Sequence, residues 1–221
     1  MHLTRWQTFL ILLTSLFLVG LVIADAQKQT VVITPEQIAK ATKKYGPIAG
    51  KRFEAWQQLV DDNINKSERI KLEKVNDFFN HVLWASDKKH WGKSDYWATP
   101  IEFLGTDAGD CEDFTIAKYF TLKALGVPEK KLYLTYVKAT RINQAHMVLT
   151  YFKKPRSIPL VLDNINKRIL KANKRKDLVP IYSFNGDGLW LAKERGKGKA
   201  VSGGTKKLKK WNSLLQKMDV N

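Results

Sequence analysis

Two kinds of hydrophobic spacing divide the chain after residue 26 into a helical half and a strand-rich half. Apolar side chains recur at helical spacing from Phe53 to Ile64 and again from Leu72 to Val82. Another helix is expected to open at Thr34-Pro35-Glu36-Gln37, where a capping threonine, a proline at the first helical position and a glutamine at the third form a capping box. The polar residues 65–67 predict a break between the other two helices.

The second half begins with a stretch without periodicity, residues 85–105, which predicts a long surface loop. A helical pattern then follows from Asp113 to Leu125, and Gly126-Val127-Pro128 ends it. Runs of β-branched and aromatic residues predict strands at 131–137, 146–152, 158–162 and 178–184, with a fifth at 189–191 and a short basic helix at 208–218. Helices followed by strands are typical of the α+β class.

The N-terminus carries a targeting signal. Residues 6–24 contain no charged side chain, follow one basic residue, and precede Ala24-Asp25-Ala26, a small-x-small cleavage pattern. This order predicts a secretory signal peptide at 1–26, and an uncleaved membrane-spanning helix is the alternative. Either one places the remaining chain on the far side of the plasma membrane. We therefore divide the chain into residues 1–26, a main domain at 27–191, and a basic loop and tail at 192–221.

The charge of the chain is strongly positive and unevenly distributed. Lys and Arg number 38 against 21 Asp and Glu, a formal net charge of +17, and residues 164–221 hold 15 of the basic and 4 of the acidic side chains. The Gly- and Lys-rich stretch Lys193–Lys210 predicts a mobile, solvated loop or tail. No nucleic-acid-binding module is recognisable, so nucleic acid is not an expected partner. Attraction to an acidic partner or an anionic membrane, or a plain solvated surface, remains open.

Cys111 is the only cysteine, which excludes an intramolecular disulfide and any site that needs several thiolates. It lies in Gly109-Asp110-Cys111-Glu112-Asp113, between a turn and an apolar helix. A helix N-terminus stabilises the thiolate, the nucleophilic form of cysteine. A nucleophile is thus one interpretation of Cys111, beside a buried structural thiol and an intermolecular bridge.

His146 and Asp163 complete a candidate catalytic set. His146 opens one predicted strand and Asp163 ends the next, so both can approach Cys111 at one edge of a helix-on-sheet domain. The imidazole would deprotonate the thiol and later protonate the leaving group, while the carboxylate would orient the ring. The structural alternatives are a satisfied polar histidine and a turn-forming aspartate, and His81 and His90 are rival bases.

Three carboxylates, Asp110, Glu112 and Asp113, surround the thiol. Their negative charges should disfavour the thiolate. Two explanations remain open at this stage. Acidic residues are favoured at a helix N-terminus, where the dipole is positive. Alternatively, they supply oxygen ligands to a hard cation such as calcium, which would cancel the repulsion.

Two strings of residues, Trp97–Gly105 and Gly109–Tyr119, resemble the bacterial transglutaminase-like cysteine proteinases. Within that family the chain is most similar to the periplasmic adhesin-cleaving proteases of the LapG type, over roughly Pro47 to Trp190. The resemblance implies a papain- or transglutaminase-like α+β fold, with N-terminal helices and the cysteine helix packed on an antiparallel sheet. It implies Cys111 as nucleophile, His146 as base and Asp163 as the orienting acid.

The resemblance also implies a cofactor, a substrate and a partner. Ca²⁺ would be bound by Asp110, Glu112 and Asp113. The substrate would be a large surface adhesin, cut in the periplasm near its N-terminus at a small-residue, Ala-Ala-like site, which releases the cell from a biofilm. An inner-membrane receptor that senses cyclic di-GMP would sequester the protease. Two alternatives share the residues: a transglutaminase or amidase with the same triad, and a non-catalytic envelope binding module.

Overall fold

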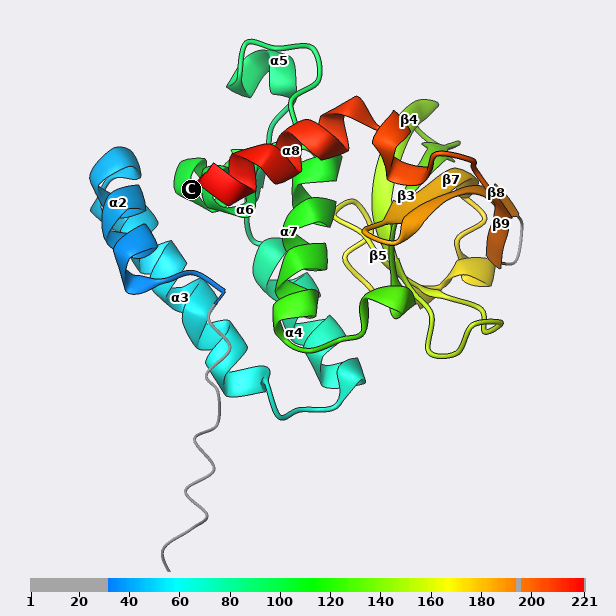
Figure 1. The fold of residues 1–221 in the computed structure, drawn as a ribbon, viewed down its shortest axis with the longest axis horizontal. Helices are drawn as coiled ribbons and strands as arrows, with labels where there is room; N and C mark the ends of the chain where they lie inside the picture. Colours follow the sequence, from blue (N-terminus) through cyan, green and yellow to red (C-terminus); the bar gives the residue numbers. More distant parts are fainter. Residues whose placement is uncertain (1–31, 194–195, 221) are drawn as a thin grey trace, which may run out of the picture.

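The computed structural model describes residues 32–193 and 196–220, so the predicted signal segment 1–26 lies outside the described residues. Figure 1 shows a group of helices beside an antiparallel sheet, with one long helix, α7, between them. The α+β class is confirmed. Within the described ranges, no helix has the length and apolar character that crossing a bilayer requires.

The predicted helices form, and their ends follow local signals. At the first helix, the Thr34 hydroxyl accepts from the Gln37 N–H at 3.2 Å and the Gln37 side chain accepts from the Thr34 N–H at 2.9 Å, as the capping box requires. Gly46 then turns the chain at φ 91°, a conformation that favours glycine. The helices are α2 (Pro35–Tyr45), α3 (Pro47–Asn63), α4 (Glu68–Phe79), α5 (Asp87–His90), α6 (Pro100–Thr106), α7 (Cys111–Ala124) and α8 (Lys209–Val220).

The main sheet has the strand order β6-β5-β4-β3-β7-β8-β9, and all its pairings are antiparallel. All five predicted strands are present, whereas β6 and β9 were not predicted, nor was the separate two-stranded parallel pair β1-β2. The strands are β1 (Leu83–Trp84), β2 (Ala108–Gly109), β3 (Leu132–Ala139), β4 (Gln144–Tyr151), β5 (Leu160–Leu162), β6 (Leu170–Lys171), β7 (Leu178–Asn185), β8 (Gly188–Lys193) and β9 (Gly196–Ala200).

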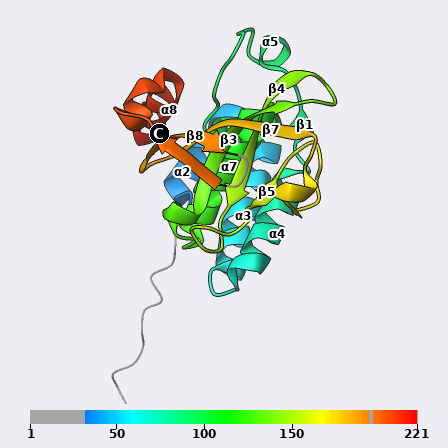
Figure 2. The same cartoon turned by 90° about the vertical axis from the view of Figure 1, so that its right-hand side faces the viewer.

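The topology brings several chain segments to one end of this sheet. Ala139 at the end of β3 pairs with Gln144 at the start of β4 and with Leu178 at the start of β7. β5 runs antiparallel to β4, so Leu162 at the end of β5 lies toward the same side. In both views α5 projects at the same end of the molecule as the turn between β3 and β4 (Figures 1 and 2). The residues that leave these strand ends are therefore neighbours in space.

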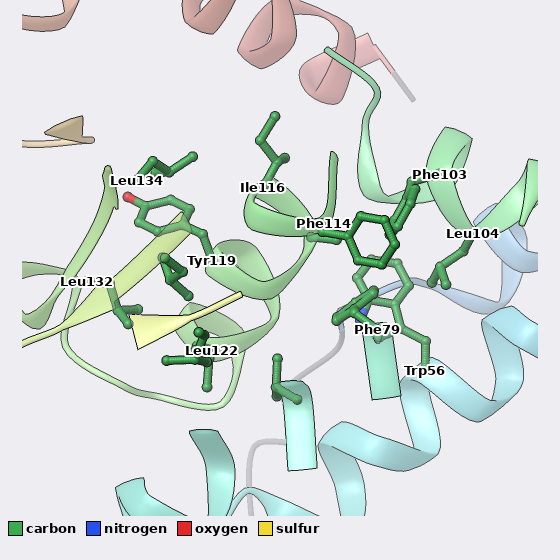
Figure 3. Packing of buried hydrophobic residues seen from close by; sticks show 14 of the residues in the cluster. Trp56, Phe79, Phe103, Leu104, Phe114, Ile116, Tyr119, Leu122, Leu132 and Leu134 are labelled. Carbon is green, nitrogen blue, oxygen red and sulfur yellow. The ribbon is translucent and has the colours of Figure 1, made fainter. Parts of the chain in front are cut away.

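Helix α7 is buried on two sides because it packs on β4 and β3 as well as on α4 and α6. Figure 3 shows Phe114 directed toward Phe103 and Phe79, while Tyr119 and Leu122 lie nearer the sheet residues Leu132 and Leu134. A helix enclosed in this way is apolar around much of its circumference. The burial fixes the position of its first residue, Cys111, relative to the sheet.

The prediction of a loop over residues 85–105 is wrong in part. The segment contains α5 and most of α6, and α6 opens with a capping box between Thr99 and Glu102, with Pro100 at its first position. This is the same pattern that opens α2. Helix α6 has only seven residues, which is too short to display a helical hydrophobic period. Periodicity therefore did not reveal it.

Residues 192–221 contain more regular structure than a basic loop and tail. The predicted helix at 208–218 is present as α8, whereas β9, which pairs with β8, takes the place of part of the predicted loop. Trp211 and Leu214 of α8 are buried in the main core, and the Trp211 ring stacks on Phe120 of α7 with 5.8 Å between centroids. The exposed lysines at the start of α8 gave no indication that these two side chains are buried.

Candidate active site

Cys111 is the first residue of α7, with Asp110 as the N-cap. The thiol is half-buried and donates to Glu112 Oε2 at 3.1 Å. Gly109 is required before it, since a Cβ there would lie 2.5 Å from Asp113 Oδ2 and 2.7 Å from the Phe103 ring. Cys111 therefore packs partly against the main core while it also lines a cavity.

His146 and Asp163 form a buried pair at the converging strand ends. His146 Nε2 lies 2.8 Å from Asp163 Oδ1, and both side chains are at most 3% exposed. His146 and Cys111 line one cavity of about 540 Å³, with Tyr136 and Tyr182 on another of its walls. The two tyrosine rings stack at 5.1 Å. The structure therefore pairs His146 with Asp163 and places His146 and Cys111 on one cavity.

Asp163 has more partners than sequence reasoning supplied. Besides His146, its carboxylate accepts from the Ile165 N–H at 3.0 Å and from Arg175 Nη2 at 2.7 Å. Burial opposes ionisation, but these donors and the charge of His146 hold the pKa of Asp163 well below its usual range. Arg175 lies beyond the strands and carries no sequence signal.

The main chain of Asp163 is also held from the helical side. Its carbonyl accepts from Asn80 Nδ2 at 3.0 Å and from Lys118 Nζ at 3.3 Å, and Lys118 also donates to Asn76 and Asn80. Lys118 is 1% exposed. A lysine between the apolar residues of the middle of α7 is the one signal by which the sequence could have pointed to this cluster.

The rival histidines lie elsewhere. His81 is exposed, and its Nδ1 contacts the Asp77 carbonyl at 2.8 Å. His90 Nε2 contacts Thr106 Oγ1 at 2.9 Å. Neither is among the residues that line the cavity holding Cys111. The geometry thus favours His146 as the base.

The electrostatics around the thiol follow the direction expected from the sequence, with an additional cause. Burial is the largest effect that raises the pKa of Cys111 well above its usual value, and the charges of Glu112 and Asp110 add to it. Burial likewise raises the pKa of Asp110 to about 9, with Glu112 contributing. The pKa of Asp113 is also raised, mainly by burial. Without a cation the site opposes the thiolate.

Two further aspartates join the acidic cluster. Oxygens of Asp87, Asp110 and Asp113 lie within 4.8 Å of one another, as do those of Asp87, Asp95 and Glu112. Asp87 and Asp95 come from the stretch that was predicted as a loop, and nothing in the sequence pattern assigned them a role. All three predicted ligands therefore belong to the cluster, and Asp87 links its two groups.

The cluster fits a hard cation better than it fits helix capping alone. Asp113 uses both oxygens on backbone N–H groups, those of Ala98 at 2.8 Å and Asp110 at 3.3 Å. By contrast, Asp87 Oδ1 and Asp110 Oδ1 are buried and have no hydrogen-bond partner among the described residues. A buried carboxylate oxygen without a donor is costly, and an all-oxygen donor set is the one that calcium prefers.

A cysteine at a helix N-terminus, facing a histidine–aspartate pair at the end of an antiparallel sheet, is the arrangement of papain- and transglutaminase-like cysteine hydrolases. The chain belongs to the bacterial transglutaminase-like cysteine proteinases (BTLCP), whose family model matches residues 54–190. By class it is a cysteine protease. Among curated proteins, none matches the chain.

Solved structures of Legionella pneumophila LapG are similar to this chain over most of its length. One is 45% identical, covers 84% of this chain and 98% of its own, and has a TM-score of 0.72. A calcium-bound form is 47% identical, covers 84% and 99%, and has a TM-score of 0.73. An EGTA-treated form is 46% identical, covers 84% and 98%, and has a TM-score of 0.74. The transglutaminase-like fold and the LapG-type resemblance are thereby confirmed.

Proposed function

We propose that the protein is a calcium-dependent cysteine endopeptidase with Cys111 as nucleophile, His146 as base and Asp163 as the orienting acid. The observation that carries the proposal is the buried 2.8 Å contact between His146 Nε2 and Asp163 Oδ1, beside a cavity that Cys111 also lines. Because Asp163 accepts, Nε2 carries the proton. Nδ1 is then the nitrogen left to take the proton of the Cys111 thiol.

The reaction follows from these positions. The thiolate attacks the scissile carbonyl, and the imidazolium gives its proton to the leaving amine, which leaves a thioester on Cys111. His146 then takes a proton from water, and the resulting hydroxide attacks the thioester carbonyl. The carbon–sulfur bond breaks, the acid product is released, and the thiol of Cys111 is regenerated. Asp163 keeps the ring in one tautomer through both halves.

Calcium is the cofactor that the residues of the site fit. Asp87, Asp95, Asp110 and Glu112 would hold it, with Asp113 bracing the turn that carries Asp110. When bound, the ion would neutralise the carboxylates that oppose the thiolate. The calcium-bound and EGTA-treated LapG structures, at 46–47% identity, support this assignment.

We also propose a substrate, a location and a partner. The substrate is a large surface adhesin, cut near its N-terminus at a small-residue site in the periplasm, which releases the cell from a biofilm. A membrane receptor sensing cyclic di-GMP holds the protease back. Support comes from the similarity to LapG and from the signal-like residues 1–26.

Mass spectrometry of the processed chain tests export. The chain should begin at or near Gln27, and retention of residues 1–26 would establish an anchor.

The decisive experiment incubates the wild type and Cys111→Ala with the N-terminal part of a large adhesin from the same organism, in calcium and in EGTA. We expect two fragments, separated at a small-residue site, only from wild type in calcium. A labelled primary amine in the same reaction tests the alternative. Incorporation of the amine into a glutamine-bearing acceptor, without peptide cleavage, would replace the protease by a transglutaminase.

A further inference from the structure

The connection between β6 and β7 crosses one face of the sheet and arrives at the end where the catalytic residues lie. Lys171 at the end of β6 pairs with Leu160 at the start of β5, at the opposite end of the sheet. Ala172 and Leu178 both pack on the same face of the sheet, so the chain crosses that face to reach β7. Arg175 lies on this crossing segment and is 4% exposed.

The guanidinium of Arg175 is shared between two aspartates. Nη2 donates to Asp163 Oδ2 at 2.7 Å and to Asp177 Oδ2 at 2.8 Å, and Nε donates to Asp177 Oδ1 at 3.0 Å. The fork on Asp177 fixes the plane of the guanidinium. The other N–H of Nη2 then determines where Oδ2 of Asp163 lies.

The other oxygen of Asp163 is thereby directed to the histidine. Oδ1 accepts from His146 Nε2 and from the Ile165 N–H, so each carboxylate oxygen has its own donors. Because the two oxygens move together, rotation of the carboxylate would disturb the contacts with Arg175 and with His146 at the same time. The cation also favours the ionised form of a carboxylate that burial would otherwise protonate.

Asp177 connects this pair to the strand that carries His146. Its carbonyl accepts from the N–H of Thr140 at 2.8 Å and from the Thr140 hydroxyl at 3.1 Å, at the turn from which β4 departs. The contacts form a closed circuit from that turn through Asp177, Arg175 and Asp163 to His146, and back along β4. A closed circuit resists displacement of any one member.

We propose that Arg175 is a positioning residue, which keeps Asp163 ionised and oriented so that its Oδ1 faces His146 Nε2. The inference rests on the proposed triad. A buried ion pair by itself adds little net stability compared with an apolar replacement. The pair between Arg175 and Asp163 acts instead by fixing the orientation of the His146 ring. Loss of Arg175 should therefore lower kcat while leaving KM nearly unchanged.

The test compares Arg175→Gln and Arg175→Lys in the full chain, with Arg168→Gln as the matched control, because Arg168 is exposed on the preceding connection between β5 and β6. Arg175→Gln should lower kcat by roughly 10- to 100-fold, the usual effect of removing a partner that orients a catalytic ligand. Arg175→Lys keeps the charge but loses the fork, so it should recover part of the rate. Arg168→Gln should match the wild type.

A second readout needs no substrate and separates this inference from the proposed function. The His146 Nε2–H proton should give a downfield, exchange-protected ¹H resonance in the wild type, in Arg168→Gln and more weakly in Arg175→Lys, but not in Arg175→Gln. If the wild type cleaves no adhesin, the proposed function fails while the resonance still tests Arg175. Arg175→Gln that keeps the resonance, or that loses only thermal stability at unchanged kcat, would overturn the inference.

Asp177→Asn serves if Arg175→Gln does not fold. It removes a carboxylate that holds Arg175 but keeps the contact between Arg175 and Asp163. We expect the same kind of loss at smaller size, several-fold in kcat with KM unchanged. An unchanged kcat in Asp177→Asn would contradict the circuit as the source of orientation.

Discussion

At the scale of single residues, the site contains buried carboxylates whose pKa values move in opposite directions. Asp163 accepts from three donors, two of them on cationic or potentially cationic side chains, and its pKa falls. Asp110 has one buried oxygen without a donor and an acidic neighbour, and its pKa rises. Burial is common to both, so the partners decide the direction. The carboxylate of Asp163 thus has all its partners within this chain, whereas ionisation of Asp110 requires a bound cation.

The roles of the three catalytic residues can be tested individually. Cys111→Ala, His146→Ala and Asp163→Asn should each lower kcat/KM for adhesin cleavage by roughly 10³-fold or more, because the three groups act as a unit. Circular dichroism and thermal melts should show a retained fold. His90→Ala is the control and should keep wild-type activity. Equal losses in His90→Ala and His146→Ala would remove the distinction that the geometry makes between them.

Asp87 offers a test of the metal site that sequence reasoning could not have designed. Asp87→Asn preserves the shape of the side chain but removes the charge that links the two carboxylate groups. Calcium affinity, measured by isothermal titration calorimetry, should fall by about tenfold or more, equivalent to ~1.4 kcal/mol. Magnesium should bind the wild type more weakly, since it demands near-octahedral geometry. Asp77→Asn, at an exposed site on α4, should bind calcium normally; equal affinities in both variants would exclude Asp87 as a ligand.

At the scale of elements, the same chemistry at α2, α6 and α7 shows what local sequence can and cannot reveal. All three helices open with a capping box, and the one at α2 was recognised. Strand positions followed from β-branched runs, and the convergence of Cys111, His146 and Asp163 followed from the order of those strands. Arg175 and Asp87 were not predictable, because Arg175 lies on a segment that crosses a face of the sheet and Asp87 lies on a segment that approaches the turn before α7. No local sequence pattern encodes such contacts.

The packing of α8 yields a prediction about stability. Trp211 is 2% exposed and contacts Tyr119, Phe120 and Phe184, whereas Trp84 is 64% exposed. Trp211→Ala should lower the free energy of unfolding by about 3–5 kcal/mol, the usual cost of removing a buried aromatic side chain. Trp84→Ala is the matched control and should change it by less than ~0.5 kcal/mol. Denaturant titration decides, and similar small effects at both positions would restore the interpretation of residues 192–221 as a loosely attached tail.

At the scale of the whole molecule, charge is segregated. The chain carries a net +17, yet five acidic side chains gather beside Cys111, at Asp87, Asp95, Asp110, Glu112 and Asp113. Lys210 of α8 reaches this cluster and pairs with Asp95 at 2.6 Å. A local excess of negative charge in a basic protein concentrates a small cation at one place. Binding of that cation is therefore expected to change the stability of the entire fold, and not the reactivity of the thiol alone.

The pH dependence of stability tests this coupling between the metal site and the fold. In the metal-free protein the pKa values of Asp110 and Asp113 are raised, to about 9 for Asp110, so the folded chain holds protons that the unfolded chain releases above about pH 5. Their contribution to stability is present at low pH and is lost as pH rises through the folded pKa. The pKa values of Asp87 and Glu112 are also raised, and they act in the same direction. Burial lowers the pKa of Lys118 to about 7, so Lys118 acts mainly above the range from pH 5 to 7. The depressed pKa of Asp163 acts only below that range.

The EGTA-treated protein should therefore melt at a higher temperature at pH 5 than at pH 7. A gain of ~1 kcal/mol corresponds to about 2–4 °C for a chain of this size. Calcium keeps the carboxylates ionised in the folded state, so it should raise the melting temperature at pH 7 by mass action and abolish the gain on acidification. Thermal melts at the two pH values, with EGTA and with excess calcium, measure both effects. Asp77→Asn should repeat the wild-type pattern, whereas Asp110→Asn should weaken the pH effect in EGTA. A metal-free protein that loses stability steadily from pH 7 to 5 would show that the acids near Cys111 are ionised without calcium.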